Sequence, residues 1–305
     1  ASSTPLTVGI PGYLLSLWKR APFILEIRDL WPEAPIQLGV LRNPAAIALA
    51  RSLERFLYRA ARHIVVLSPG MQDALRRMGI PEAKLSMIPN CCDLDLFAPR
   101  EPAPALLHQY GLHGRFVALY AGAMGMANGL DVAVEAARVL QQRESAVQLV
   151  LVGDGKERPA LQKRAAESHL QNVTFIPWVP KSELVDLMAM ADVCLVLFAP
   201  HPVLQTGSPN KFFDALALGR PVLINYGGWM RDLIERHGVG AAVPSNDPGG
   251  LAEALIALKS DPQRLRDMGR RARALAESEF DRERMSAQYE TLLGEVARGR
   301  RGDVR

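Results

Sequence analysis

The segment GSPNKFFDALALGRPV, residues 207–222, holds the side chains best suited to bind an anion. Ser208 is a favoured N-cap residue, and Pro209 is of a type favoured at the first position of a helix. The pattern therefore predicts a helix over 209–218 that stops at Gly219, because glycine commonly follows the last helical turn. The unpaired N–H groups at the start of such a helix would form an anion site.

Three side chains of the same segment could serve this anion site. Asn210 and Lys211 lie in the first turn, where a lysine opposes the helix dipole unless an anion is bound. Asp214 follows on the side of Lys211, and its short carboxylate could accept hydrogen bonds from the vicinal hydroxyls of a ribose. The alternative interpretation is a capped surface helix with an incidental contact between Lys211 and Asp214.

Two glycine-containing turns offer further backbone N–H groups. The first is AGAMGMANG at 121–129, and the second is GDG at 153–155. Glycine lets the backbone approach a ligand closely and present its N–H groups to phosphate, although glycine turns after strands are common without that role. Neither turn has the spacing of a dinucleotide or P-loop motif. The residues that we expect to contact a donor here are Gly122, Gly125, Gly153, Asp154 and Gly155.

These turns must be positioned by a parallel sheet, because short apolar runs alternate with helical segments from residue 115 onward. Ligands of open parallel sheets bind at the carboxyl ends of the strands, where the turns and a loop containing Trp178 and Val179 would meet. Expected strands are 116–121, 147–152, 173–176, 193–198, 221–224 and 240–243. Expected helices lie near 130–143, 157–168, 181–190, 209–218 and 228–236.

The first hundred residues show a similar alternation with fewer strands. We expect strands at 23–27, 63–67 and 84–88, and helices near 9–19, 44–61 and 70–78. Three parallel strands are few for a nucleotide-binding half-fold. The sequence therefore predicts an incomplete first domain whose beginning would precede Ala1.

Four regions follow from this pattern. Residues 1–98 form a partial Rossmann-like domain, and 99–114 form a proline-rich hinge. Residues 115–280 form a second Rossmann-like domain, and 281–305 form a terminal helix with a basic tail. The fold class is α/β, with two doubly wound domains.

Composition excludes several other classes of protein. The 305 residues are 49% hydrophobic, 22% charged and 6% aromatic, which is typical of a globular protein and excludes disorder, collagen and coiled coil. A net charge of +4 is too small to indicate a nucleic-acid partner. Three cysteines without a CxxC pair predict neither a zinc site nor a disulfide framework, and favour a cytoplasmic setting. Residues 1–18 lack the pattern of a signal peptide or membrane span.

Several stretches together resemble a known family. YAGAMGMANGLD, LVLVGDGKERPALQ, NVTFIPWVPKSELVDLMAMADVCLVLF and SPNKFFDALALGRPV are similar to the donor domain of retaining family 4 glycosyltransferases, which have the GT-B fold. FILEIRDLWPE, LERFLYRAARHIVVLSPGM and KLSMIPNCCDLDLF resemble the acceptor domain of that family. The SPNK-FF helix is closest to that of bacterial O-antigen and capsule N-acetylfucosamine transferases. The resemblance covers residues 3–290.

The resemblance assigns roles by position. The family's E-x7-E motif places its second acid on the nucleotide ribose, which implies that role for Asp214. Thr206 stands where the first acid would be. Met126 and Asn128 occupy the loop where a basic residue commonly clamps the diphosphate, so we expect Lys211 to replace it. Fixed positive charge there would stabilise the leaving diphosphate.

In the first domain, Asp29 follows an expected strand within RDLWP. It is a candidate catalytic residue that would position the acceptor hydroxyl, and the alternative is a cap on the next helix. Asp93 and Asp95 spell a three-residue match to the D-x-D of metal-dependent transferases, but their context fits the family's interdomain segment. No metal and no cofactor are expected, since the six histidines show no ligand spacing.

The resemblance also implies partners. We expect a donor that is a nucleoside-diphosphate sugar, with uracil as the base by family habit, and a glycolipid acceptor at the inner face of the plasma membrane. Peripheral membrane contact has support from apolar and basic residues, although a buried helix with solvated arginines is the alternative. The apolar residues are Leu14, Leu15, Leu17 and Trp18, and the basic ones are Lys19, Arg20, Arg51, Arg55, Arg59 and Arg62.

The sequence thus predicts a retaining hexosyl- or N-acetylhexosaminyl-type glycosyltransferase of bacterial surface polysaccharide synthesis. Because part of the first domain would be missing, we expect the 305-residue chain to transfer sugar poorly or not at all. Two alternatives are a GT-B-fold sugar-nucleotide epimerase and a non-catalytic nucleotide-sugar-binding or assembly subunit. The epimerase would need acid and base groups that the sequence does not offer, whereas Thr206 in place of the first acid favours the subunit.

Overall fold

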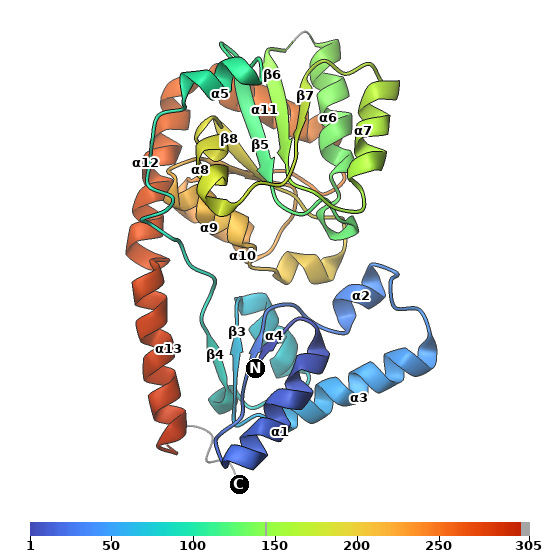
Figure 1. Ribbon diagram of the computed structural model, residues 1–305, viewed down its shortest axis with the longest axis vertical. Coiled ribbons are helices and arrows are strands. Elements are labelled where there is room, and N and C mark those ends of the chain that lie inside the picture. Colours follow the sequence, from blue (N-terminus) through green and yellow to red (C-terminus); the bar gives the residue numbers. More distant parts are fainter. Residues whose placement is uncertain (144, 300–305) are drawn as a thin grey trace. The chain divides into compact units, whose positions relative to one another are not determined.

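The computed structural model describes residues 1–143 and 145–299 and divides into two compact units (Figure 1). Unit 2 consists of Cys91–Pro200 and Pro209–Arg282. Unit 1 holds the remaining described residues, so the chain crosses between the units four times. The predicted hinge at 99–114 lies inside unit 2, and the end of the predicted basic tail, 300–305, lies outside the described residues.

Unit 1 contains a four-stranded parallel sheet in the order β1-β2-β3-β4. The sequence predicted three of these strands, and β1 was missed because two residues are too short to show a pattern. Every residue of β3 is buried, and the core joins this sheet to α3 and α4. The elements are β1 Ser2–Ser3, α1 Gly9–Lys19, β2 Ile24–Ile27, α2 Glu33–Gln37, α3 Pro44–Ala60, β3 His63–Val66, α4 Pro69–Arg77, β4 Leu85–Met87 and α13 Arg282–Ala297. Short 3-10 turns are η1 Leu6–Val8, η2 Glu82–Lys84 and η4 Pro202–Thr206.

Unit 2 contains a six-stranded parallel sheet in the order β10-β9-β8-β5-β6-β7. The six predicted strands are present, with small differences at their ends. The strands are β5 Phe116–Ala121, β6 Val147–Val152, β7 Val173–Ile176, β8 Val193–Val196, β9 Val222–Ile224 and β10 Gly240–Ala242. The helices are α5 Pro104–Gln109, η3 Met126–Asn128, α6 Asp131–Gln142, α7 Arg158–Glu167, α8 Lys181–Ala189, α9 Asn210–Ala217, α10 Trp229–His237, α11 Pro248–Ser260 and α12 Pro262–Glu279.

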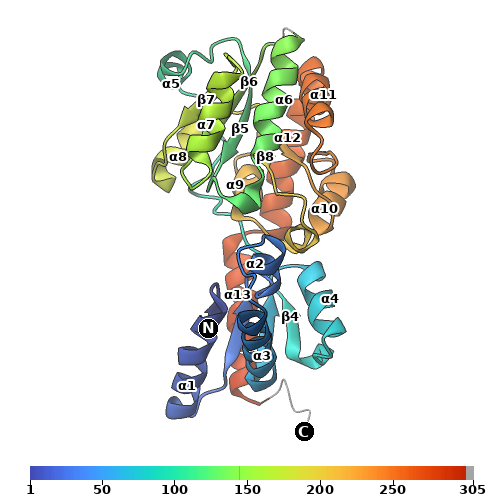
Figure 2. The same cartoon turned by 90° about the vertical axis from the view of Figure 1, so that its right-hand side faces the viewer.

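The strands of unit 2 bury side chains on both faces, as expected for a doubly wound sheet. On one face, alternate residues of β5, β6 and β8 pack against α6, α7 and α11. On the other face, the intervening residues pack against α8, α9, α10 and α12. Figure 2 shows α6 and α11 side by side over the first face. The predicted doubly wound arrangement is therefore confirmed for unit 2, and unit 1 is confirmed as an α/β unit with a parallel sheet whose four strands follow chain order.

Helices α11 and α12 were not predicted, although the sequence carries a signal for both. Each begins with an Asp-Pro pair, which places an N-cap residue before a proline in the first turn. Asp247 accepts a hydrogen bond from Gly250 N at 2.8 Å, and Asp261 accepts one from Arg264 N at 2.9 Å. These caps fix the starts of the two helices.

Candidate functional site

The candidate site lies at the carboxyl ends of three neighbouring strands of unit 2. Strands β8, β5 and β6 are adjacent in the sheet, and the three segments singled out in the sequence follow them in turn. The chain reverses its direction of winding between β5 and β8, and such switch points are where open α/β sheets bind ligands. The sheet thus brings together the segments that the sequence placed at one edge.

The two glycine turns pack backbone to backbone. Gly122 N donates to Val152 O at 3.0 Å, and Met124 N donates to Asp154 O at 2.8 Å. A Cβ on Gly153 would lie 2.0 Å from Gly122 O, closer than real Cβ atoms approach. The structure therefore requires glycine at 153 for the mutual approach of the turns.

The neighbours of Gly153 complete the second turn. A Cβ on Gly155 would lie 2.5 Å from Met124 O, so this position also needs glycine. The Asp154 side chain is exposed and accepts a hydrogen bond from Gly155 N at 2.7 Å. At Gly125, in contrast, a Cβ would meet only the end of the Asn128 side chain, at 4.0 Å, so the first turn is open there.

Helix α9 begins at Asn210, one residue later than predicted. Pro209 is the N-cap and has an extended backbone, so Ser208 lies outside the helix and makes no capping bond. The prediction that Ser208 caps this helix is therefore wrong. The buried Ser208 Oγ has no hydrogen-bond partner among the described residues, which leaves a polar atom unsatisfied just before the helix. The helix ends near Gly219 as predicted, with a positive φ of 68° at that glycine.

Lys211 points back toward β5 and the first glycine turn. Its Nζ donates to Tyr120 Oη at 2.7 Å and to Asn128 Oδ1 at 3.1 Å, and it lies 4.1 Å from the centre of the Tyr120 ring. Both hydrogen-bond partners are neutral. Burial lowers the pKa of Lys211 to about 7, because desolvation disfavours the charged form. A cation in this position has charge available for a ligand.

Asp214 is buried and contacts a different partner from the one expected. Its Oδ1 lies 3.2 Å from Lys181 Nζ at the start of α8, and no ion pair joins it to Lys211 within the described chain. Burial raises the pKa of Asp214, while the Lys181 charge opposes that shift. The interpretation of an incidental contact between Lys211 and Asp214 therefore fails, and Lys181 joins the set of candidate residues.

The loop after β7 contributes Trp178 and Val179. Trp178 is 69% exposed, which is unusual for so large an apolar side chain. Val179 is half-buried against the core beside α8. An exposed indole at the carboxyl end of a strand offers a flat apolar surface.

In unit 1, Asp29 is exposed at the end of β2 and accepts a hydrogen bond from Thr4 Oγ1 at 3.1 Å. It does not cap the following helix, since α2 has Pro32 as its N-cap and no side-chain cap. Thr206, the position of the absent first acid, also belongs to unit 1. Its Oγ1 donates to Val203 O at 2.7 Å, so its hydroxyl serves local structure.

The acidic residues offer no obvious metal site. Among residues 1–143 and 145–299, no group of three or more His, Cys, Asp or Glu side chains is arranged to hold an ion. Asp93 and Asp95 both lie near Arg282, at 2.7 Å and 3.6 Å. Their spacing thus corresponds to an ion-pair network. Over the same ranges, no helix has the length and apolar character needed to cross a bilayer.

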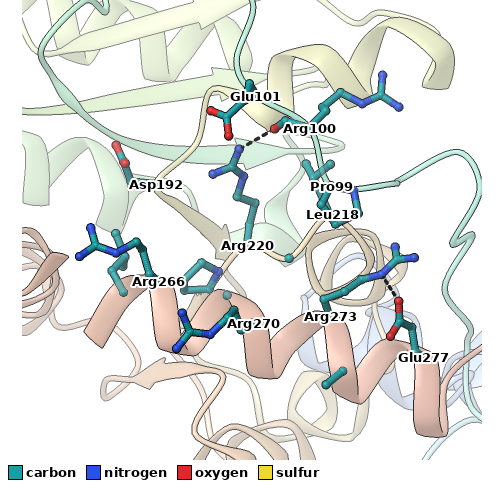
Figure 3. Close-up of a pocket in the computed structure, with 15 residues that line it drawn as sticks. Pro99, Arg100, Glu101, Asp192, Leu218, Arg220, Arg266, Arg270, Arg273 and Glu277 are labelled. Atoms are coloured by element: carbon teal, nitrogen blue, oxygen red, sulfur yellow. Dashed lines mark hydrogen bonds and ion pairs between the residues drawn. The ribbon is translucent and has the colours of Figure 1, made fainter. Parts of the chain in front are cut away.

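A hollow lies at the opposite, amino-terminal edge of the unit 2 sheet, with a volume of about 750 Å³ (Figure 3). Five arginines line it, three of them from α12. Arg273 donates to Ala217 O at 2.7 Å, and Arg220 donates to Ala189 O at 2.7 Å, so both satisfy carbonyls at helix ends. The others are Arg100, paired with Asp186; Arg270, paired with Asp267; and Arg266, bonded to Gln263. We interpret this arginine groove as a structural feature because Arg100, Arg270 and Arg273 pair with carboxylates, whereas Lys211 contacts only neutral groups.

Sequence reasoning did not select Tyr120 or Lys181 as site residues, and it named Asn128 only as a departure from a family pattern. Tyr120 lies inside a strand, where an aromatic residue is normally core. A usable signal for it was its position just before the glycine turn. Lys181 begins α8 directly after Pro180, at the same edge of the sheet.

Two glycosyltransferase family models match the chain. The model described as "Glycosyl transferases group 1" matches residues 115–261, and the "Glycosyl transferase 4-like domain" matches residues 1–91. The first match lies mainly in unit 2, apart from His201–Ser208, and the second covers unit 1 up to Asn90. Each sheet therefore carries a glycosyltransferase sequence pattern of its own.

Individual relatives agree with these matches. A putative colanic acid biosynthesis glycosyltransferase, WcaL of Escherichia coli, is 26% identical over 78% of this chain and 57% of its own length. A GDP-mannose-dependent phosphatidylinositol monomannoside mannosyltransferase of Mycolicibacterium smegmatis is 29% identical over 87% of this chain and 76% of its own. The chain thus spans between about half and three quarters of these two relatives.

A solved structure supports the fold. Anabaena Alr3699/HepE in complex with UDP-glucose has a TM-score of 0.79 with 22% identity, over 96% of this chain and 78% of that one. At this identity the likeness concerns the fold alone. Together, the two parallel sheets, the family matches and this likeness identify the chain as a glycosyltransferase with the GT-B fold.

Proposed function

We propose that this glycosyltransferase moves a sugar from a nucleoside-diphosphate donor to a lipid-linked or glycan acceptor, with retention of anomeric configuration, in bacterial surface polysaccharide synthesis. The observation that carries the proposal is Lys211, whose amino group lies at the switch point of unit 2 with only neutral partners and becomes a cation when protonated. Such a group can bind the diphosphate and stabilise the charge that develops as the sugar departs.

The neighbouring groups suit the remainder of a donor. Asp214 is close enough in sequence to share a ligand with Lys211, and its carboxylate would accept the ribose hydroxyls after exchange with Lys181. The Trp178 indole and the loop around Val179 would lie against the base. Backbone N–H groups for the phosphates would come from Gly125, Asp154, Ser208, Asn210 and Lys211, with Pro209 directing the start of α9. The N–H groups of Gly122, Gly153 and Gly155 already donate within the protein, so these glycines would line the site through their lack of a side chain.

A uridine nucleotide is our first choice of donor, because HepE was crystallised with UDP-glucose. The mannosyltransferase relative is named for GDP-mannose, so guanosine is the competing base. The E. coli relative is named for colanic acid biosynthesis, which supports polysaccharide as the product class. An N-acetylated deoxyhexose, as in N-acetylfucosamine transfer, is the sugar that the SPNK-FF helix favours. Asp29 would position the acceptor hydroxyl.

The acceptor side would rest on the inner face of the plasma membrane. Helix α1 exposes Leu14, Leu15, Leu17 and Trp18, at 52–75% of each residue. Beside it lies a hollow of about 590 Å³ lined by Tyr13, Ser52, Arg55, Phe56, Arg59 and Ala60. Apolar side chains next to arginines suit an anionic lipid surface. Binding to phosphatidylglycerol vesicles that is lost on changing Trp18 and Leu14 to Ser, and is absent with phosphatidylcholine, would support this contact.

The direct test is donor binding followed by transfer. Calorimetry with UDP, GDP and dTDP should show preferential UDP binding that Lys211→Ala and Asp214→Ala weaken. Nuclear magnetic resonance of the product formed from a UDP-sugar should show the donor's α or β configuration retained. Interconversion of donor epimers without acceptor would instead indicate an epimerase. Binding without any turnover would indicate a non-catalytic subunit, and no nucleotide binding would overturn the proposal.

A further inference from the structure

The hydrogen bonds around Lys211 form a short directed chain. Tyr120 Oη donates its single proton to Ala123 O at 2.6 Å, so it can only accept from Lys211. Asn128 Oδ1 is also an acceptor, at 3.1 Å. The lysine nitrogen must therefore donate to both partners.

A neutral amine meets this arrangement completely, because it has two N–H groups and both are used. An ammonium group has a third N–H, which finds no acceptor among the described residues. A partly buried donor without a partner costs free energy, and more when it carries charge. The acceptors that the protein itself offers thus favour the neutral amine, in agreement with a pKa of Lys211 lowered to about 7 by burial.

Among the residues that the structure describes, no nearby charge offsets this preference. From β5, the facing titratable group is Tyr120, whose pKa burial raises, and η3 offers only the neutral Asn128. In the turn after β6, the exposed Asp154 carboxylate accepts Gly155 N. On α9 itself, Asp214 pairs with Lys181. Of these groups, only the Tyr120 ring, whose centroid lies 4.1 Å from Nζ, would stabilise the charged form of Lys211.

The third N–H has room to meet a ligand. Gly122 has no side chain, and a Cβ there would lie 3.0 Å from Lys211 Nζ. The nitrogen therefore lies directly beneath the backbone of the first glycine turn, where the proposed diphosphate would bind. A phosphate oxygen could accept the third N–H and supply the missing charge partner.

We propose that Tyr120 and Asn128 are positioning residues that hold Lys211 as a proton-coupled anchor for the donor diphosphate. The neutral amine takes one proton from solvent as the diphosphate binds, and the new N–H donates to a phosphate oxygen. No other bond forms or breaks. This inference rests on the proposed function, because it assigns the diphosphate to Lys211.

The experiment is calorimetric titration with UDP from pH 6 to pH 9, in pairs of buffers with different ionisation enthalpies. The difference within each pair gives the number of protons taken up. For the unmodified chain we expect uptake near zero at pH 6, rising toward one proton by about pH 9. Lys211→Arg is the matched control, since arginine stays charged over this range and should bind UDP without uptake.

Two further variants test the positioning residues. Asn128→Asp places a carboxylate beside Lys211, which should keep the lysine charged and abolish proton uptake. Tyr120→Phe removes an acceptor that the ammonium needs more than the amine does. It should weaken UDP binding by about tenfold and move the midpoint of uptake to a lower pH. A purely structural role for Tyr120 would weaken binding at every pH without moving that midpoint.

The outcomes separate the two proposals. If UDP fails to bind at every pH, the proposed function fails. If UDP binds and the unmodified chain and Lys211→Arg take up the same number of protons, the donor site stands and the proton-coupled anchor is overturned. Uptake in the unmodified chain that both Lys211→Arg and Asn128→Asp lack would support it.

Discussion

The two edges of the unit 2 sheet use cations in different ways. At the carboxyl edge, Lys211 is held by a phenol and an amide. At the amino edge, the arginine groove contains more positively charged side chains. Its guanidinium groups bond to carboxylates, carbonyls or a glutamine amide. Comparison of the edges shows that the number of cations is a poor guide to an anion site. Three of the five arginines, Arg100, Arg270 and Arg273, pair with carboxylates, whereas Lys211 contacts only neutral groups.

The backbone differs between the edges as well. Both depend on a glycine that lies against another backbone: Gly153 against Gly122 at the carboxyl edge, and Gly269 against Gly219 at the amino edge. Only the first pair belongs to the proposed donor site. Substitution at the two edges should therefore separate effects on stability from effects on ligand binding.

The largest effect is expected from Gly153→Ala. A Cβ would lie 2.0 Å from Gly122 O at a φ of +135°, so the turns must separate. We expect the free energy of unfolding to fall by about 3 kcal/mol and UDP binding to be lost. Gly269→Ala, with a Cβ 2.5 Å from Gly219 O, should also destabilise the fold. Its folded fraction should keep the UDP affinity of the unmodified chain, as denaturation and calorimetry can measure.

Lys211→Met should have the second largest effect. Loss of this side chain, which lies at the carboxyl edge with only neutral partners, should weaken UDP binding by about 10- to 100-fold, corresponding to about 1.5–3 kcal/mol for hydrogen bonds to a charged group. Arg266→Met in the arginine groove is the matched control, because it removes one positive charge from the same unit. Equal losses of affinity in the two variants would show that only the overall charge matters.

Arg273→Met should have a smaller effect on stability. Its guanidinium group donates to Ala217 O at 2.7 Å and pairs with Glu277 at 2.6 Å. Loss of the carbonyl contact should lower the free energy of unfolding by about 1–2 kcal/mol, measured by urea denaturation. UDP affinity should stay within about twofold. A large loss of affinity would place ligand binding at the amino edge and contradict the comparison.

The smallest effect concerns pH. Burial lowers the pKa of Lys211 from 10.5 to about 7, so between these values the unfolded chain binds more protons at this group. Its contribution to the free energy of unfolding therefore rises with pH, by at most about 1.4 kcal/mol per unit. The slope of stability against pH between 7 and 8 should be shallower in Lys211→Met than in Arg266→Met. Identical slopes would mean that Lys211 is charged in the folded chain.

Much of unit 2 could be predicted because its strands are continuous apolar runs, and a parallel sheet brings their following turns to one edge. The same logic placed Lys211 and the glycines near one another. It could not place Lys181 beside Asp214, because that pair joins the first residue of α8 to the middle of α9, and the two residues are 33 positions apart in the chain. The orientation of the Lys211 side chain toward Tyr120 could not be predicted from the sequence either, since side-chain rotamers depend on packing.

The error at Ser208 has a local cause. The sequence pattern of a serine followed by proline fits an N-cap, yet Pro209 takes an extended conformation and becomes the cap itself. After this shift of one residue, the cap has no hydroxyl, and no side chain caps the start of the helix. Helix starts are therefore less reliable guides to a ligand contact than the strands that precede them.

The most direct test is a crystal structure of the chain with UDP. We expect a β-phosphate oxygen about 2.9 Å from Lys211 Nζ, while Tyr120 and Asn128 keep their contacts with that nitrogen. Diphosphate held by the arginine groove, or bound at the carboxyl edge without contact to Lys211, would contradict the proposed donor site.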